Sequence, residues 1–146
     1  MTEAHEIPPI REWLIEAAQR SASDLHLVAG YPPIRREHGV MVQMDYPPLD
    51  ATAVRASLKS ICTDEDFSRF ERDRNFDFAL QLDQQDNGEL AQRFRVNYFY
   101  SGETPGACMR IIPATIPDLD WSNFPAALAE RICSLRNGMI VFSGVT

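Results

Sequence analysis

Residues 92–112 read QRFRVNYFYSGETPGACMRII, and their side chains alternate in type. Within Gln92–Tyr100, every second residue from Phe94 onward is apolar or aromatic. A period of two is typical of an antiparallel strand with one buried face. The turn-like run Ser101–Pro105 follows, and Gly106–Ile112 has the composition of another strand. This stretch therefore predicts two antiparallel strands joined by a turn.

The same alternation over Asn75–Leu82 predicts a preceding strand, so the chain is expected to have an α+β fold built on an antiparallel sheet. The polar loop Asp83–Glu89, with its turn signal Asn87-Gly88, would join that strand to the next. The other predicted elements are a helix over Ile10–Ala18, strands over Asp24–Val28, Ile34–Glu37 and Val40–Met44, and helices that start after Asp50 and at Thr63.

The apolar residues of the 92–112 stretch predict how its two strands pair. Pairing Phe94 with Ile111 places the apolar side chains of both strands on one face, whereas a slip of one residue would separate them. This register puts Arg95 directly opposite Arg110 on the other face. Two like charges in opposed positions are destabilising unless an acid or an anion lies between them. Two alternatives follow. Asp77 could neutralise the two arginines through an ion pair within the sheet, or the two arginines could bind a phosphate, which a partner subunit could hold.

The composition of the chain limits the ligands that this arginine pair can bind. The chain has 146 residues, 45% of them apolar, and its 14 basic and 21 acidic residues give a net charge of −7. That length suits one domain and a piece of a second. The acidity excludes a general binder of nucleic acid or of anionic membranes. Residues 92–113 are the basic exception, because Arg93, Arg95 and Arg110 outnumber Glu103 there.

Other chemistry has little support. His5, His26 and His38 lack the spacing of metal ligands, so no metal site is expected. The three cysteines are widely spaced, which suits a reducing compartment. No nucleophile has a base partner by motif, and neither a signal peptide nor a membrane-spanning apolar run is visible. We therefore expect no self-contained active site in this sequence.

The C-terminal part has a different pattern. Two prolines frame a linker over Ala114–Asp120, and a helix is predicted over Phe124–Leu135. The apolar run Met139–Phe142 then predicts a buried strand. A buried strand followed by glycine is an unusual end for a domain, so we interpret the chain as truncated. Without partner strands, this run is expected to promote aggregation or a swapped dimer.

A series of short motifs resembles the N-terminal part of the PilT-like retraction ATPases, which power the twitching motility of type IV pili. The motifs are ASDLHL at 22–27, GYPP at 30–33, NFDF at 75–78, RFRVN at 93–97, MRIIP at 109–113 and RNGMIVFSG at 136–144. Each motif is weak alone, but their order and spacing together are fairly specific. The last motif resembles the strand that leads into a P-loop, although the lysine and Ser/Thr of a P-loop are absent.

The resemblance implies a PAS-like antiparallel sheet with flanking helices over residues 1–113. Residues 114–146 would then be a linker and the first helix and strand of a RecA-like ATPase domain. In this family six chains form a ring, where the N-terminal domain of one chain packs on the ATPase domain of its neighbour. Arginines of the N-terminal domain contact nucleotide phosphates at that interface.

Arg95 and Arg110 occupy the matching positions for those phosphate contacts, and Gly144 and Thr146 match the start of the P-loop. A forked guanidinium near the γ-phosphate offsets charge that develops during phosphoryl transfer. The resemblance implies ATP and Mg²⁺ as cofactors of a full-length parent, and no cofactor or activity for this stretch alone. It also implies a cytoplasmic homo-hexamer at the inner membrane, with the pilus base or a platform protein as partner, no nucleic acid and no direct membrane insertion.

The sequence departs from the family pattern in three places. The loop Gly102–Pro105 lacks the arginine usual there, Val145 replaces the usual P-loop proline, and Glu37–Gly39 replaces an Asp-Gly turn. Two other functions therefore stay open. One is the N-terminal domain of a secretion or pilus-assembly ATPase. The other is a free-standing PAS-like sensor or docking module.

Overall fold

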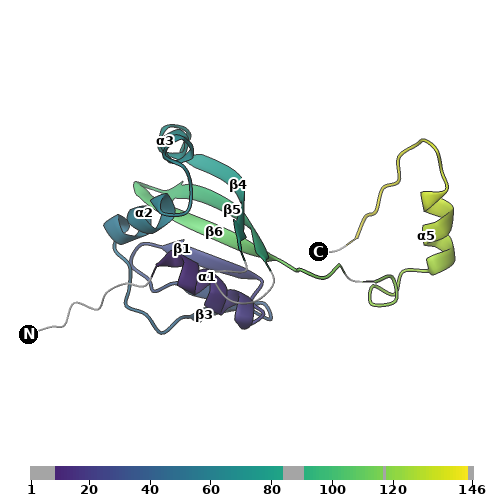
Figure 1. Cartoon of the computed structure of the whole chain (residues 1–146), viewed down its shortest axis with the longest axis horizontal. Helices are drawn as coiled ribbons and strands as arrows, with labels where there is room; N and C mark the ends of the chain where they lie inside the picture. Colours follow the sequence, from purple (N-terminus) through teal and green to yellow (C-terminus); the bar gives the residue numbers. More distant parts are fainter. Residues whose placement is uncertain (1–8, 84–90, 117, 145–146) are drawn as a thin grey trace, which may run out of the picture. The chain divides into compact units, whose positions relative to one another are not determined.

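The computed structural model describes residues 9–83, 91–116 and 118–144 of the chain. The chain divides into two compact units, Met1–Ala114 and Thr115–Thr146 (Figure 1). The predicted turn at Asn87-Gly88 lies outside the described residues, as do His5, Val145 and Thr146.

The first unit is built on a six-stranded antiparallel sheet with the strand order β3-β2-β1-β6-β5-β4. The strongly alternating stretches of the sequence form β4 and β5 as predicted, since side chains on one face of each are more buried than those on the other. The strands are β1 (Asp24–Val28), β2 (Ile34–Glu37), β3 (Val40–Gln43), β4 (Asn75–Leu82), β5 (Gln92–Ser101) and β6 (Thr104–Ile112). β1 therefore lies at the centre of the sheet, between β2 and β6.

The described residues of this unit also form three helices, α1 (Ile10–Gln19), α2 (Ala51–Lys59) and α3 (Asp64–Asp73). The side chain of Asp50 accepts a hydrogen bond from the backbone N–H of Ala53, at 2.7 Å, which caps α2. Thr63 caps α3 in the same way, by accepting from the N–H of Asp66. Both predicted helix starts are confirmed, because these short oxygen side chains satisfy backbone donors that a helix leaves unpaired.

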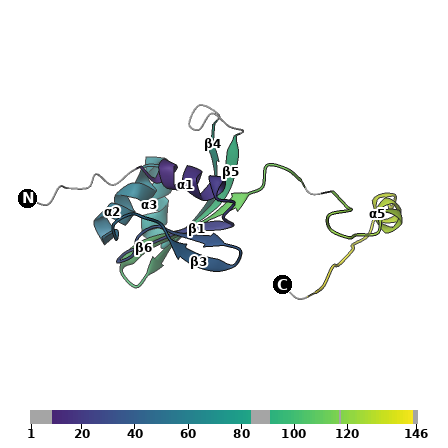
Figure 2. The same ribbon diagram turned by 90° about the horizontal axis from the view of Figure 1, so that it is seen from below.

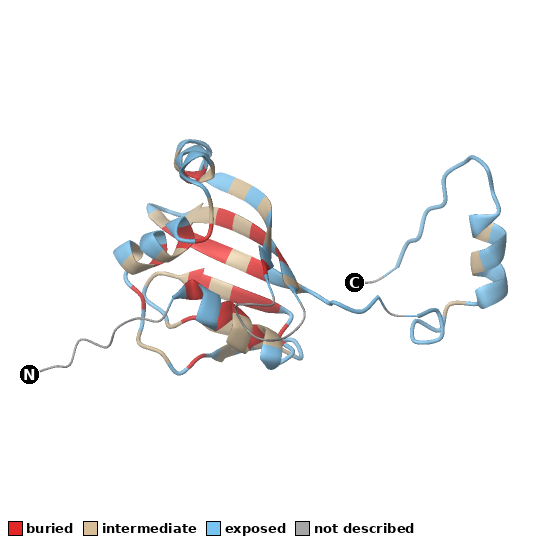
Figure 3. Ribbon diagram, viewed as in Figure 1, coloured by how far each residue is buried: buried red, intermediate tan, exposed pale blue. Residues whose placement is uncertain are grey.

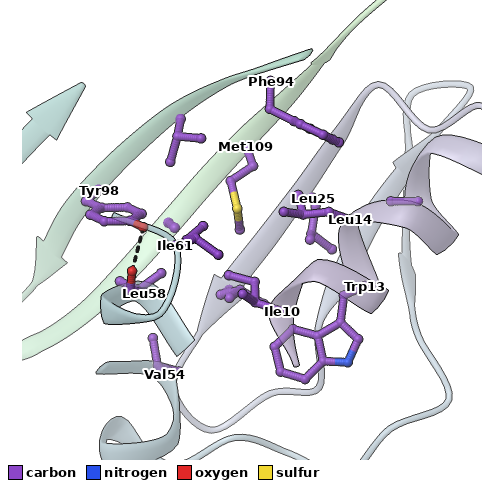
Figure 4. Close-up of a cluster of buried hydrophobic side chains, with 14 of the residues drawn as sticks. Ile10, Trp13, Leu14, Leu25, Val54, Leu58, Ile61, Phe94, Tyr98 and Met109 are labelled. Carbon is purple, nitrogen blue, oxygen red and sulfur yellow. Dashed lines mark hydrogen bonds between the residues drawn. The ribbon is translucent and has the colours of Figure 1, made fainter. Parts of the chain in front are cut away.

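All three helices contribute to a core on one face of the sheet (Figures 1 and 2). Trp13 of α1, Leu58 of α2 and Phe70 of α3 are fully buried, together with Tyr98 and Met109 of the sheet. Figure 4 shows part of this core, with a hydrogen bond in which the Tyr98 hydroxyl donates to the Leu58 carbonyl at 2.8 Å. Burial raises the pKa of Tyr98, since the phenolate form would lose its hydration there.

The second face of the sheet carries no helix of the described residues of this unit. Burial alternates along β5 and along β6 from Ala107 onward (Figure 3), because successive side chains point to opposite faces. The residues that face away from the core on these strands include Arg95, Asn97, Cys108 and Arg110. This surface of the six strands is called the open face below.

The turn between β5 and β6 is tighter than the sequence predicted. Ser101 pairs with Thr104, so only Gly102 and Glu103 lie between the strands, and β6 starts two residues before Gly106. Gly102 has a positive φ of 62°, which a two-residue hairpin turn favours and glycine adopts without strain.

In the second unit, the described residues form one helix, α5 (Ala126–Cys133), within the predicted range Phe124–Leu135. The predicted strand at Met139–Phe142 is wrong, because these residues have irregular backbone. Strand conformation needs a hydrogen-bonded neighbour, and the described part of this unit has no strand to supply one. The side chains of this run are mostly exposed, from 43% for Ile140 to 86% for Met139. Across the described ranges, no helix is both long and apolar enough to cross a membrane.

Candidate functional site

Four charged residues of the open face form one row across four neighbouring strands. Arg95 of β5 lies directly opposite Arg110 of β6, which confirms the register predicted from the apolar residues. Arg110 in turn lies opposite Asp24 of β1, and Asp24 lies opposite Arg36 of β2. Three guanidinium groups and one carboxylate therefore succeed one another across the strands. This set is called the arginine row below.

Each arginine of this row has an acidic neighbour. Arg110 donates from Nε to Asp24 Oδ1 at 3.2 Å, and Arg36 Nε lies 3.5 Å from Asp24 Oδ2. Arg95 Nε lies 3.9 Å from an oxygen of Asp77 on β4. The Asp24 side chain is 9% exposed, whereas those of Arg110 and Arg95 are 65% and 73% exposed. The carboxylate is thus held inside while the two opposed arginines remain open to an incoming anion.

A second row lies beside the first on the same face. It consists of Asp77, Asn97, Cys108 and His26, each directly opposite the next. Asn97 donates to Asp77 at 3.1 Å, which orients that carboxylate beside Arg95. Burial lowers the pKa of His26 and raises that of Cys108, since burial disfavours the charged form of each. Both side chains are therefore neutral at pH 7 and supply no charge to the site.

The two rows enclose a hollow of about 220 Å³. It is lined by Asp77, Arg95, Asn97, Cys108 and Arg110. Beside it lies a more apolar hollow of about 400 Å³, in which Arg93, Ala79 and Ile112 join Asp77 and Arg95. All three predicted arginines thus line one continuous part of the open face.

This arrangement suits an anion with several oxygens. Arg110 donates to Asp24 from Nε, so the terminal nitrogens of its guanidinium fork can donate to another acceptor. Among the described residues, the three arginines of the row pair with two carboxylates, Asp24 and Asp77, so these five side chains together carry one net positive charge. Structural neutralisation and anion binding, the two alternatives open from the sequence, are therefore compatible in one site.

Sequence reasoning missed Asp24 and Arg36. The alternation of Asp24 with the buried Leu25 and Leu27 places it on the opposite face to the core, and that signal was available. What the sequence did not indicate was that β1 lies beside β6, so that Asp24 faces Arg110. Of the predicted P-loop residues, Gly144 lies in irregular backbone of the second unit, and Thr146 lies outside the described residues.

No protein-family model matches the chain. Among curated proteins, the type IV pilus retractation ATPase PilT of Pseudomonas aeruginosa is 31% identical over 137 residues, which is 94% of this chain and 38% of that protein. This chain is a homologue of the PilT-like ATPases. The match falls on their N-terminal region. A twitching motility protein of Neisseria gonorrhoeae is 29% identical over 82% of the chain and 30% of its own length. The chain thus spans about a third of the length of these PilT-like relatives.

Two solved ATPase structures share this fold over about a third of their own length. A crystal structure of the pilus retraction motor PilT with bound ADP matches 84% of this chain and 34% of its own, with a TM-score of 0.70 and 29% identity. The ATPase DotB of Legionella pneumophila matches 89% of this chain and 36% of its own, with a TM-score of 0.68 and 23% identity. The DotB likeness is evidence for the fold alone.

Proposed function

We propose that this chain is the N-terminal domain of a hexameric ATPase that retracts type IV pili. In this proposal residues 1–113 are a PAS-like domain, and residues 114–146 are the linker and the start of a RecA-like ATPase domain. The open face packs on the ATPase domain of a neighbouring subunit. Similarity to the retractation ATPase PilT and to a twitching motility protein supports retraction over the assembly and sensor alternatives.

The observation that carries the proposal is the opposed pair of Arg95 and Arg110 on the open face. Both side chains line the 220 Å³ hollow and are about two-thirds or more exposed. A neighbouring subunit that places a nucleoside triphosphate there would bring its phosphates within reach of two guanidinium forks. These forks would offset charge on the transferring phosphoryl group, a role that depends on position and charge and needs no proton transfer.

The remaining parts of the proposal concern the whole protein. ATP and Mg²⁺ would bind to a P-loop that Gly144 and Thr146 begin, and the ring would work on the cytoplasmic side of the inner membrane, against the pilus base or a platform protein. The PilT structure with bound ADP supports the choice of nucleotide. These features follow from homology and not from a site in the described residues.

The test is ATP turnover and oligomer size of the gene product expressed in full. We expect a hexamer, and we expect Arg95→Ala and Arg110→Ala each to reduce turnover roughly ten-fold or more, since phosphate-contacting arginines contribute 10³–10⁵ in related chemistry. Arg72→Ala is the matched control, because Arg72 lies on α3 with its side chain 72% exposed and contacts only Asp73 among the described residues. No turnover by the unmodified protein, or unchanged turnover in both arginine variants, would contradict the proposal.

A further inference from the structure

Asp24 is the one member of the arginine row that is buried, and it is shared by two arginines. Its Oδ1 accepts from Arg110, and its Oδ2 lies 3.5 Å from Arg36 Nε and also accepts from the Ser23 hydroxyl at 2.9 Å. Each carboxylate oxygen thus has its own arginine. The two arginines come from strands on opposite sides of β1.

A buried carboxylate is strongly destabilised when its last cationic partner leaves. If Arg110 were the only cationic partner of Asp24, an anion that drew Arg110 away would have to offset the full free-energy cost of leaving the Asp24 carboxylate unpaired. Because Arg36 and Ser23 hold the second oxygen, Arg110 can turn to another acceptor while Asp24 stays paired.

We propose that Arg36 is a positioning residue that regulates phosphate binding by retaining Asp24 when Arg110 moves to the phosphate. This inference rests on the proposed function, in which phosphates bind over Arg95 and Arg110. Arg36 acts through Asp24 and does not touch the phosphate. It is two strands from Arg110 and three from Arg95, which at the usual strand spacing puts its backbone roughly 14 Å from that of Arg95.

The experiment is a double-mutant cycle on the chain, with pyrophosphate as the probe and binding followed by NMR titration. The proteins are the unmodified chain, Arg36→Gln, Asp24→Asn and the double variant. We expect Arg36→Gln to weaken pyrophosphate binding at least five-fold, because Arg110 must then stay with Asp24. In the Asp24→Asn background, where no buried charge has to be retained, the same change should alter binding less than two-fold.

Three controls make the outcome decisive. Arg72→Gln removes the same charge from α3 and should alter binding less than two-fold, while Arg36→Lys keeps a cation for Asp24 and should restore most of the affinity. Thermal unfolding of each variant verifies that it is folded. An equal loss from Arg36→Gln in both Asp24 backgrounds would mean direct contact or general electrostatics and would overturn the inference, as would no binding by the unmodified chain.

The same titration separates this inference from the function on which it rests. If Arg95→Gln and Arg110→Gln weaken pyrophosphate binding but the cycle shows no coupling, the arginine pair binds phosphate and the role of Arg36 is wrong. If neither variant weakens binding, the phosphate site itself is elsewhere, and the same substitutions in the gene product expressed in full will leave ATP turnover unchanged.

Discussion

Arg110 and Asp24 are 86 residues apart in the sequence, yet Arg110 donates a hydrogen bond from Nε to Asp24 Oδ1 at 3.2 Å across β6 and β1. The exposed arginine and the buried acid differ in what each loses when the pair is broken. The arginine returns to water, whereas the acid stays inside the protein with whatever partners remain.

This asymmetry predicts non-additive stability effects. Arg110→Gln alone is expected to lower the free energy of unfolding by about 1 kcal/mol or less, because Arg110 is largely solvated and Asp24 keeps Arg36. The double variant Arg36→Gln with Arg110→Gln leaves the Asp24 carboxylate without a cation, a loss of about 3–5 kcal/mol. Urea unfolding of the single and double variants measures this difference. A double loss equal to the sum of the single losses would contradict the shared pairing.

The half-buried His26 predicts a dependence of stability on acid pH. Burial lowers the pKa of His26, and the nearby charge of Asp24 only partly opposes this effect. The unfolded chain takes up a proton below about pH 6.5 that the folded chain resists. The stability that neutral His26 contributes is therefore present above about pH 6.5 and is lost as the pH falls.

Urea midpoints between about pH 7.5 and 5 test this dependence. His26→Gln should flatten the decline in stability, while His38→Gln, at an exposed turn position, should leave it as it is. If the His26→Gln chain loses as much stability on acidification as the unmodified chain, other groups cause the decline and the prediction is wrong.

The buried Tyr98 predicts that stability falls at alkaline pH. An unfolded tyrosine ionises near pH 10, whereas burial raises the pKa of Tyr98 in the folded chain. Stability is therefore retained below about pH 10 and falls above it, by up to about 1.4 kcal/mol per pH unit. Tyr98→Phe should make this alkaline decline shallower and cost about 1 kcal/mol at neutral pH, since the Leu58 carbonyl loses a donor. Tyr31→Phe, at a side chain that is 52% exposed, is the control, and equal effects of the two changes would refute the prediction.

Gly106 of β6 lies beneath a neighbouring aromatic ring. A Cβ at this position would come within 2.9 Å of Phe99 Cε2 and 3.0 Å of the Leu27 carbonyl oxygen. The ring can move, but the carbonyl belongs to the central strand β1. We expect Gly106→Ala to lower the free energy of unfolding by about 1–3 kcal/mol. Most of that loss should persist in a Phe99→Ala background, because the Leu27 carbonyl remains. If the Gly106→Ala chain is as stable as the unmodified one, β1 can shift to make room for the Cβ and the prediction is wrong.

The run Met139–Phe142 predicts self-association of this chain at high concentration. Val141 and Phe142 are 75% and 71% exposed, and adjoining exposed apolar side chains favour contacts between copies. Val141→Asp should reduce the association seen by analytical ultracentrifugation. Ser143→Asp adds the same charge without removing apolar surface and should have a smaller effect. A monomer at every concentration would disprove the prediction.

Local patterns predicted most of the elements of the first unit, because a period of two or of 3.6 is visible within one stretch of sequence. They also predicted the caps at Asp50 and Thr63 and the pairing of β5 with β6, which a short turn joins. The run Met139–Phe142 shows where this reasoning ends. Apolar β-branched composition favours a strand, but a strand forms only when another strand supplies its hydrogen bonds.

The sequence by itself determined that Arg95 and Arg110 are opposed on one face, since apolar alternation sets the register of adjacent strands. The tertiary structure alone decided that β1 lies between β2 and β6, which brings Asp24 and Arg36 into the same row. Strand order depends on pairing between distant segments, and no local period reports it. The opposed pair of Arg95 and Arg110 could therefore be predicted from the sequence. The position of the buried Asp24 between Arg110 and Arg36 depends on the strand order and is given only by the tertiary structure.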